Sequence, residues 1–365
     1  MILHLYFARR FAMIFLMLTL VMYALIALID LVDQTRSFGA LDIGFPSILA
    51  LTLLNVPETL NQILPLITIL ATVALFISLA RSSELVVTRA AGRSGLGTLV
   101  APAVLSLLIG AIAVTMLNPI VASTSKRYDA LAESHRTGGA STLSISGEGL
   151  WLRQGGEDRQ TVISARRSNG DASVLIGVTF LELVPGRGPI RRIDAHRASL
   201  QNRAWLLHGA KEWPLERGVN PEGAARSHDE LILPSTLTVD RIRESLSQPN
   251  AISIWNLQEF ISQLDRAGFS SRQHRVHLQS ELARPFFLLS MVLVAAAFTM
   301  RPTRLGGTGR SVLTAVLLGF ALYFVRSFAE ILGENGQIPI LLAAWAPPAA
   351  SICLALGLLL HAEDG

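Results

Sequence analysis

Long apolar runs without charged residues alternate with short charged segments at both ends of the chain. Four of these runs are long enough to cross a bilayer as helices: Phe11–Ile29, Thr59–Ala80, Ser94–Ser125 and Asn335–Ala362. Two shorter runs, Pro285–Met300 and Ser311–Val325, are extended by apolar turns on their flanks. We therefore predict six transmembrane helices, because a helix satisfies its own backbone hydrogen bonds in lipid.

The middle of the chain, residues 126–284, has no such run, and charges recur there every few residues. It separates the predicted spans into three and three. Its short β-branched or aliphatic segments are divided by clusters of turn residues, and many such segments are typical of a sandwich or jellyroll. The segments are Thr142–Ile145, Gly149–Arg153, Thr161–Ala165, Ser173–Val184, Ile190–His196, Ala204–Leu207 and Glu230–Leu233. The predicted fold class is an α-helical membrane protein with an inserted all-β, jellyroll-like domain.

The segment Val174–Leu183 is apolar on both faces of its predicted strand. Two interpretations remain open. The strand is buried between two sheets, or one face packs on a core while the other lines an apolar groove.

A helix over 256–267 is predicted after the strands. Asn256 and Glu259 resemble a capping box, the following apolar residues form one stripe, and Gly268 suits the end of a helix. The expected organisation is therefore helices 1–3 in 1–125, with a cytoplasmic helix at about 82–93, a β domain in 126–250, a helical connector in 251–277, and helices 4–6 in 278–365.

Prolines are expected to shape three of the spans. Pro65 should kink the second, Asn118-Pro119 should end the third, and Pro347-Pro348 should bend the sixth.

The positions of the basic residues predict the orientation of the spans in the membrane. Arginines precede span 1 and fill the loops between spans 2 and 3 and between spans 4 and 5, at Arg9, Arg10, Arg81, Arg89, Arg93, Arg301, Arg304 and Arg310. Positively charged short loops stay in the cytoplasm. Both termini are thus predicted to be cytoplasmic and the central domain periplasmic. Cys353 is the only cysteine, so no disulfide forms within the chain.

The sequence proposes no catalytic or metal site. It has no Gly-x-x-x-x-Gly-Lys-Ser/Thr loop and no Gly-x-Ser-x-Gly elbow. His274 and His277 stand three residues apart without a third ligand in view, which favours a solvated helix face. We expect no enzyme activity, no cofactor in this chain and no nucleic-acid partner.

The loop between spans 2 and 3 carries the most information. Ser82 or Ser83 can cap a short helix, Glu84 complements its dipole, and Gly92 can end it. Either this helix docks onto a partner, with Leu85, Val86 and Arg89 available for contact, or the segment lies on the lipid head groups.

This loop, Ser83-Glu84-Leu85-Val86 followed by Arg89-Ala90-Ala91-Gly92, resembles the coupling helix of the lipopolysaccharide export permeases LptF and LptG. The resemblance covers the whole chain, and the exit of helix 1 and the segment before helix 4 are closer to LptG. Further similar segments are Val32-Asp33-Gln34, Gly149-Leu150-Trp151, Ile252-Ser253-Ile254, Ala283-Arg284-Pro285, Gly319-Phe320, Leu322-Tyr323 and Ile338-Pro339.

The resemblance implies an LptF–LptG heterodimer bound to two copies of a separate ATPase, LptB, which holds ATP and Mg²⁺. The coupling helix would lie in a groove of that ATPase, with Glu84 as the polar contact and Leu85 and Val86 as the apolar contacts. The docking residues expected on this basis are Ser83, Glu84, Leu85, Val86, Arg89, Ala90 and Gly92.

It also implies lipopolysaccharide as cargo, passed to the periplasmic jellyroll together with an LptC-type subunit. Helices 1 and 5 would form lateral gates, and basic residues at the top of helix 1 would meet the phosphates. This chain has Asp30 and Asp33 there and only one cation, Arg36. Arg36, divalent ions or a less anionic cargo are the open alternatives. Arg326 is a second candidate, either for the head groups or for an ion pair with Glu330.

Two other classes of function remain open. One is a permease or scaffold of another ABC-type envelope system, such as lipoprotein release. The other is a membrane-bound transferase for lipid-linked sugars, which would need acidic or histidine residues at the outer interface.

Overall fold

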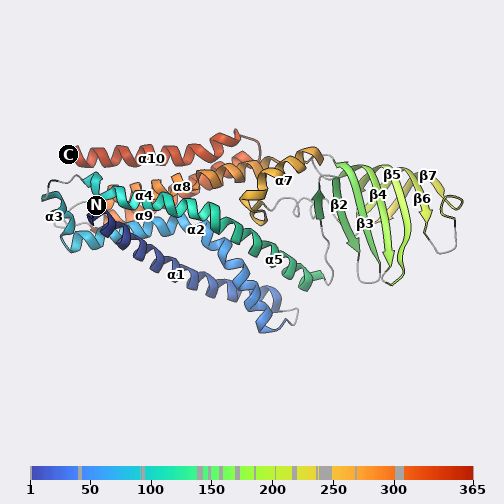
Figure 1. Ribbon diagram of the computed structural model, residues 1–365, viewed down its shortest axis with the longest axis horizontal. Helices are drawn as coiled ribbons and strands as arrows, with labels where there is room; N and C mark the ends of the chain where they lie inside the picture. Colours follow the sequence, from blue (N-terminus) through green and yellow to red (C-terminus); the bar gives the residue numbers. More distant parts are fainter. Residues whose placement is uncertain are drawn as a thin grey trace. The chain divides into compact units, whose positions relative to one another are not determined.

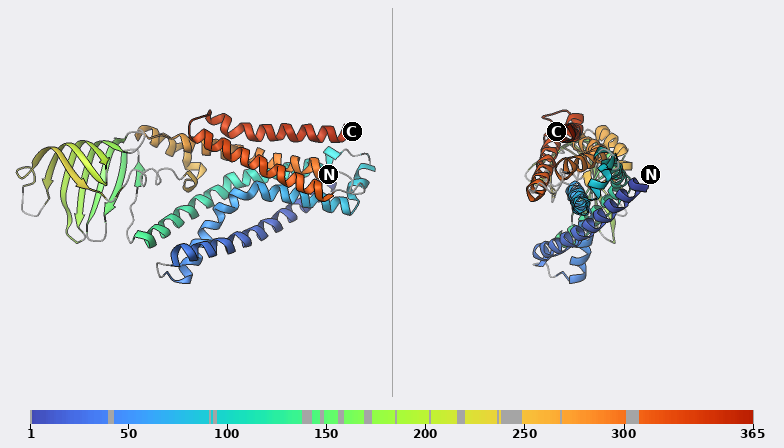
Figure 2. Two further views of the ribbon diagram at one scale, coloured as in Figure 1. Left: turned by 180° about the vertical axis from the view of Figure 1, so that it is seen from behind. Right: turned by 90° about the vertical axis from the view of Figure 1, so that its left-hand side faces the viewer.

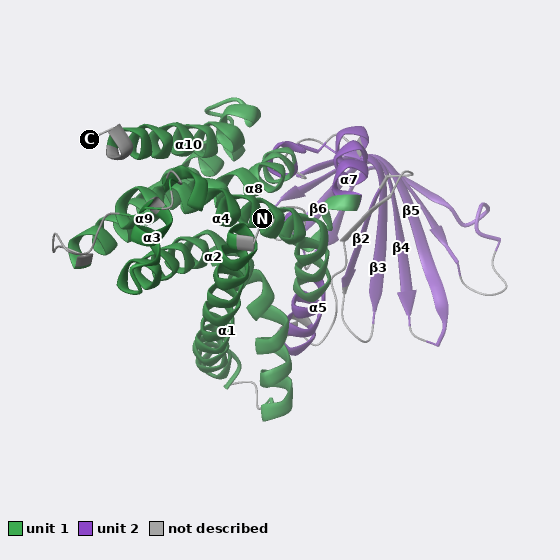
Figure 3. Cartoon of the chain, turned by 60° about the vertical axis from the view of Figure 1, so that its left-hand side comes forward, with its two compact units in different colours: residues 1–125, 250–255, 275–365 green, residues 126–249, 256–274 purple. Residues whose placement is uncertain are grey.

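The computed structural model describes most of the chain, in the ranges 2–39, 43–90, 92, 95–137, 143–146, 149–155, 159–168, 173–184, 186–201, 203–215, 220–235, 237, 249–267, 269–300 and 308–364. The chain divides into two compact units (Figure 3). Unit 1 comprises 1–125, 250–255 and 275–365, and unit 2 comprises 126–249 and 256–274.

Helices make up almost all of unit 1. In chain order the chain's helices are α1 (Ile2–Phe38), α2 (Phe45–Arg81), α3 (Glu84–Ala90), α4 (Gly95–Ile112), the π-helix η2 (Ala113–Leu117), α5 (Asn118–Thr137), the 3₁₀-helix η3 (Pro249–Ala251), α7 (Ile254–Ala267), α8 (Arg272–Thr299), α9 (Thr308–Glu334) and α10 (Ile340–Asp364). Among the described residues, six helical stretches are long and apolar enough to cross a membrane, three on each side of the inserted unit. The predicted number and arrangement of spans are confirmed.

Two of the six spans form the centre of unit 1. About two thirds of the apolar stretch of α2 and of α8 is buried inside the protein, at 67% and 72%, against 6% for α1 and 17% for α9. The core contains Phe11, Phe76 and Phe287, all buried. Helix α2 packs against α1 and also against α9 (Figures 1 and 2).

The prolines singled out in the sequence lie within helices and do not end them. Helix α2 begins at Phe45, fourteen residues before the apolar run that starts at Thr59, and Pro46 lies in its first turn where no backbone N–H is needed. Pro65 lies inside the same helix, and Pro347 and Pro348 lie inside α10. The prediction that the third span ends at Asn118-Pro119 is wrong: the helix passes through η2 and continues as α5.

At Asn118-Pro119, groups from residues far along the chain complete the hydrogen bonding. Pro119 has no N–H to donate, and the indole Nε1 of Trp255 donates to the carbonyl of Thr115, at 3.3 Å. Asn118 Oδ1 accepts from the backbone N–H of Ile254, at 2.9 Å, and so caps α7. Helix α7 therefore begins two residues before the predicted cap at Asn256.

Unit 2 contains a sheet of seven antiparallel strands, and each strand pairs with its neighbours in the sequence. The strands are β1 (Leu143–Ser146), β2 (Gly149–Gly155), β3 (Gln160–Ser168), β4 (Val174–Val184), β5 (Gly188–Gln201), β6 (Ala204–Pro214) and β7 (Arg226–Pro234). The predicted all-β domain is confirmed. Its described strands lie in one sheet, whereas the sequence suggested two packed sheets.

Two glycines lie at aligned positions on the two strands that flank β5 in this sheet. Gly177 in β4 and Gly209 in β6 have φ values of 63° and 62°, in the left-handed region that favours glycine. Both lie opposite His196 of β5, since the register pairs the residues on either side of it with those flanking the two glycines. Glycines at such aligned positions let a sheet turn a corner.

The sheet curls around its own core. The hydroxyl of Ser235, just after β7, donates to Gln154 Oε1 of β2 at 2.8 Å, although five strand spacings would separate the two strands by about 24 Å in a flat sheet. The inner face buries Phe180 and Trp205 edge to face, and Leu264 of α7 joins the same core. In β4 the inner residues are thus buried, while Ile176 on the outer face is exposed.

Candidate functional sites

The predicted docking segment forms a short helix directly after α2. Helix α3 starts at Glu84, three residues after the last residue of α2. Ser83 has a φ of 59°, and its carbonyl accepts from the backbone N–H groups of Val86 and Val87. Gly92 has a φ of 79°, which suits the end of a helix. Ala91, Arg93 and Ser94 lie outside the described residues, as does the side chain of Arg89.

Glu84 joins three helices through one arginine of α1. Arg10 Nη1 donates to Glu84 Oε1 and to the hydroxyl of Tyr6, and Arg10 Nη2 donates to Ser78 Oγ of α2, each at 2.7 Å. Ser82 Oγ donates to the same Glu84 oxygen at 2.6 Å. Partial burial opposes ionisation of Glu84, but these hydrogen bonds outweigh it and hold the pKa of the carboxyl below its ordinary value.

The apolar side chains of α3 point in two directions. Leu85 is 6% exposed and belongs to the core of unit 1, so it holds α3 against the bundle. This corrects the expectation that Leu85 is available to a partner. Val86 is exposed as expected, and Val87, which the sequence analysis did not select, is 67% exposed. Ala90 ends the helix and is exposed.

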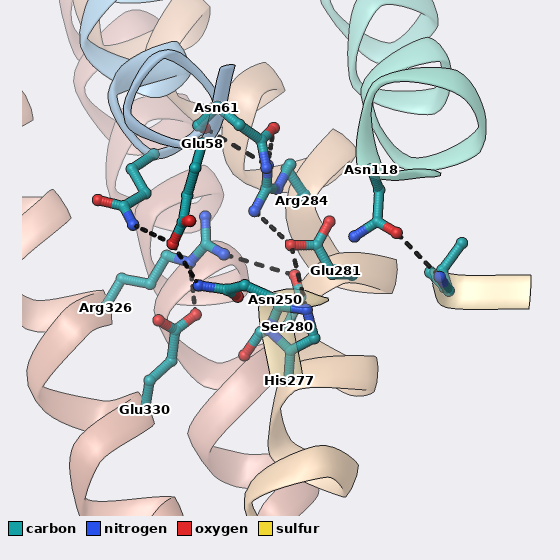
Figure 4. Close-up of polar contacts among 12 residues, drawn as sticks. Glu58, Asn61, Asn118, Asn250, His277, Ser280, Glu281, Arg284, Arg326 and Glu330 are labelled. Carbon is teal, nitrogen blue, oxygen red and sulfur yellow. Dashed lines mark hydrogen bonds and ion pairs between the residues drawn. The ribbon is translucent and has the colours of Figure 1, made fainter. Parts of the chain in front are cut away.

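A second set of polar residues lies in the first half of α2, away from α3 (Figure 4). Glu58 Oε2 accepts from Ser125 Oγ of α5, and Glu58 Oε1 accepts from Asn250 Nδ2, both at 2.9 Å. One carboxylate therefore contacts the segment by which the chain leaves unit 1 and the segment by which it first returns.

Asn61, one helical turn further along α2, contacts α8. Arg284 donates through Nη1 to Asn61 Oδ1 and pairs through Nη2 with Glu281. All three residues are buried. A buried guanidinium needs such partners, because an unpaired charge is costly away from water. His277 lies near Glu281, with 4.0 Å between Nε2 and Oε1.

The two histidines of the 270s are not on a solvated face. His274 is buried and its ring contacts Phe260, at 5.2 Å between centroids. His277 lies in the polar cluster of α8. The predicted solvated helix face is therefore wrong. Among the described residues, no group of three or more His, Cys, Asp or Glu is arranged to hold a metal ion.

Arg326 of α9 is buried and engaged. Its Nε pairs with Glu330 Oε1 at 2.9 Å, one turn along the helix, as one of the two interpretations of this residue predicted. Its guanidinium also lies over the ring of Phe287, at 4.8 Å from the centroid, and Nη2 donates to the carbonyl of Ser280 at 3.5 Å. Arg326 thus joins α9 to α8.

The last turns of α1 carry the other candidate head-group residues. Asp33 and Arg36 are exposed there. Asp30, by contrast, accepts from Asn55 Nδ2 of α2 at 2.7 Å, so it ties the two helices together. Arg36 and Arg326 lie on different helices, α1 and α9.

Sequence reasoning missed the residues that join these helices, namely Arg10 as the partner of Glu84 and the set Glu58, Asn61, Ser125, Asn250 and Glu281. One signal was present: Glu58 and Arg284 stand immediately before apolar runs. An ionisable residue at the border of a span commonly has a specific partner.

Six helices long enough to span a membrane, three before and three after an inserted β unit, with a short helix after the second span, define a multi-pass membrane protein. The sequence model of the lipopolysaccharide export system permease LptF/LptG matches residues 5–361, and the chain belongs to this family. It is a multi-pass inner-membrane protein.

Curated relatives cover almost the whole chain. The chain is 25% identical over 358 residues to the lipopolysaccharide export system permease protein LptG of Escherichia coli K12, with 94% of each chain covered. It is 24% identical over 350 residues to the protein of the same name from Haemophilus influenzae, with 93% of this chain and 92% of the relative covered.

Proposed function

We propose that this chain is a permease subunit of an ABC transporter that extracts lipopolysaccharide from the outer leaflet of the inner membrane and passes it to a periplasmic bridge. The observation that carries the proposal is the family match over 5–361, which includes both triplets of spans, the β unit and α3. The likeness to proteins named LptG favours the LptG role within the pair.

The energy source is a separate LptB-type ATPase, present in two copies, which binds ATP and Mg²⁺ itself. The absence of a P-loop from the sequence supports this division of labour. Helix α3 is the proposed dock, where Val86 and Val87 supply exposed apolar surface beside Glu84. An LptF-type permease is the heterodimer partner, and an LptC-type subunit is the periplasmic one.

The proposed orientation follows from the arginines of the short loops. Arg9, Arg10 and Arg81 lie beside α3 or at the start of α1, and the positive-inside rule places such loops in the cytoplasm. Both termini and α3 are then cytoplasmic, and unit 2 is periplasmic.

The cargo needs a continuous apolar route. Exposing a methylene group to water costs about 0.8 kcal/mol, so an acyl chain of about a dozen carbons costs on the order of 10 kcal/mol. The inner face of the curled sheet is apolar, with Phe180 and Trp205 at its centre. In this structure those side chains fill the interior, so acyl chains would enter only when the sheet opens. The sheet would open where Gln154 of β2 contacts Ser235 after β7.

The anionic head group requires different contacts. Arg36 is the exposed cation at the end of α1, and Asp33 lies three residues before it. A carboxylate beside a phosphate suits a bridging divalent cation, because such ions take oxygen ligands. Arg326 would contribute only after leaving Glu330 and the carbonyl of Ser280.

A photocrosslinking experiment tests the proposal. A photoreactive amino acid replaces Leu207, which is buried on the inner face of β6, in the complex of both permeases, the ATPase and the periplasmic subunit. A matched variant carries the same group at Ile232, an exposed residue of β7. We expect crosslinks to lipopolysaccharide at position 207 that require ATP hydrolysis, and far fewer at 232. Crosslinks to a lipoprotein in place of lipopolysaccharide would contradict the proposal and favour a lipoprotein-release system.

A further inference from the structure

We infer that Glu58 is a positioning residue that transmits movement of α2 to two of the four chain segments joining unit 1 to the β unit. The inference rests on the proposed function, in which an ATPase moves α3 and the cargo passes to unit 2. Glu58 accepts from Ser125 and Asn250 at 2.9 Å each, and these are the border residues of unit 1 at two of the points where the chain crosses between the units.

Helix α2 is suited to carry such a movement. It connects directly to α3 at Arg81, and its apolar stretch is mostly buried, so it moves only together with its neighbours. Glu58 lies 23 residues before Arg81, or about 35 Å along a helix. A displacement at the ATPase dock therefore reaches the border residues through one continuous helix.

The chemistry of the carboxylate explains why one residue holds both segments. An ionised carboxylate has two acceptor oxygens, and here each accepts from a different segment. Hydrogen bonds to an ionised group are roughly twice as strong as neutral ones. Glutamine at this position keeps one acceptor oxygen and can donate to the hydroxyl of Ser125, so it should preserve the geometry in weaker form. Alanine removes both contacts.

The remaining crossings are held near the same level of the bundle. Asn61, one turn after Glu58, binds Arg284 of α8, the helix by which the chain finally returns to unit 1. Ile254 and Trp255, which precede the crossing at residues 255 and 256, are bound by Asn118 and Thr115. Glu58 differs from these residues because it contacts two of the crossings at once.

The first test separates transmission from folding. The reconstituted complex is compared as wild type, Glu58→Ala, Glu58→Gln and Leu53→Ala, where Leu53 is an exposed residue of α2 that precedes Glu58. ATP hydrolysis and lipopolysaccharide crosslinked to unit 2 are measured on the same samples. We expect Glu58→Ala to lower the transfer per ATP by about fivefold or more, a typical coupling effect, with hydrolysis changed less than about twofold. Glu58→Gln should restore most of the transfer.

A parallel fall of hydrolysis and transfer in Glu58→Ala would assign the residue a merely structural role and overturn the inference. So would unchanged transfer per ATP. The double variant Ser125→Ala/Asn250→Ala should reproduce the loss, and adding Glu58→Ala to it should cause little further change, because contacts that act as a unit are not additive.

A second measurement does not depend on the cargo. Spin labels are placed at Leu53 of α2 and Arg167 of β3, both exposed, after Cys353→Ser removes the native thiol. We expect ATP binding to the complex to change the distance distribution between the labels in the wild type, and not in Glu58→Ala. An equal change in both proteins, or none in the wild type, would overturn the inference even if lipopolysaccharide is transported. Failure of the crosslinking experiment with success here would instead contradict the proposed cargo.

Discussion

The spans of unit 1 fall into two contrasting pairs. The inner pair, α2 and α8, is mostly buried, and its buried residues Asn61, Glu281 and Arg284 join the two helices. The outer pair, α1 and α9, is mostly exposed along its apolar stretches. In lipid, apolar side chains gain little from being covered by protein, so helices there associate through close packing and polar contacts. The inner pair therefore forms the scaffold, and the outer pair is left free to face lipid or a second subunit.

This contrast agrees with what the family resemblance implies for α1 and α9, the first and fifth spans, as lateral gates. The exposed residues of α9 form a continuous apolar surface, comprising Leu313, Leu317, Phe320, Phe324, Val325, Phe328 and Ile331. A gate must separate from its neighbour to admit lipid, and a helix with few buried contacts does so at low cost.

The largest predicted difference between the two pairs is in the free energy of unfolding lost when a phenylalanine of each pair is replaced. Phe76 of α2 is buried, whereas Phe324 of α9 is 65% exposed. Phe76→Ala leaves a cavity and should lower the free energy of unfolding by about 3 kcal/mol, whereas Phe324→Ala should cost less than about 1 kcal/mol. Thermal unfolding of the purified protein in one detergent compares them. Equal losses would show that the outer face is packed as tightly as the centre.

Two glycines at helix contacts sharpen the comparison. A Cβ on Gly110 of α4 would lie 2.4 Å from the backbone Cα of Pro285 in α8, and one on Gly319 of α9 would lie 2.3 Å from the terminal methyl of Ile69. Backbone cannot move aside as a side-chain end can, so Gly110→Ala should cost about 1–3 kcal/mol and Gly319→Ala less. Gly357→Ala, which meets nothing within 4 Å, is the control. Yields and melting temperatures in the reverse order would contradict this assignment of the scaffold.

The contact between Arg10 and Glu84 joins an outer helix to the docking helix. If Glu84 serves the ATPase directly, Glu84→Lys should abolish copurification of the ATPase, and Arg10→Ala should weaken it only moderately. If the residue acts only by holding α3, the two variants should lose the ATPase equally, and Arg10→Glu/Glu84→Arg should regain it. We expect the first result, with both variants still inserted in the membrane. Normal copurification with Glu84→Lys would refute the proposed dock.

The smallest predicted effect is a pH dependence of the same contact. The pKa of Glu84 is lowered in the folded protein, so the stabilisation is present above the pKa of the unfolded state, about 4.3, and is lost as the pH falls through the lower folded value. The pair is partly exposed, which limits its contribution to at most about 1 kcal/mol. The difference in unfolding free energy between wild type and Glu84→Gln should therefore shrink between pH 6 and pH 3. A difference that grows towards low pH would have the wrong sign.

Much of the fold could be predicted because its signals are local. Uncharged runs marked the spans, and short β-branched or aliphatic segments between turn clusters marked all seven strands, although the predicted segments end five residues before the end of β5 and seven before the end of β6. The path through Asn118-Pro119 could not be predicted, because the groups that satisfy the break come from Ile254 and Trp255, far along the chain. The curl of the sheet was hidden for a similar reason, since the contact between Gln154 and Ser235 and the alignment of Gly177 with Gly209 across β5 involve residues far apart in the sequence.

The candidate sites could likewise be predicted only in part. The start of α3 at Glu84 and its termination near Gly92 follow from local capping signals. The inward direction of Leu85 does not, because a helix of two turns is too short for a periodic pattern to reveal a face. The contacts of Glu58 join residues 58, 125 and 250, which no sequence period connects.

The account depends most on α3 and the β unit lying on opposite sides of the membrane. Single cysteines at Val87 of α3 and at Arg167 of β3, both exposed, are introduced after Cys353→Ser and probed with a membrane-impermeant maleimide in intact spheroplasts and in lysed ones. We predict that position 167 reacts in intact spheroplasts and that position 87 reacts only after lysis. Reaction of position 87, but not 167, in intact spheroplasts would contradict the account, because the proposed dock and the cargo domain would have exchanged sides.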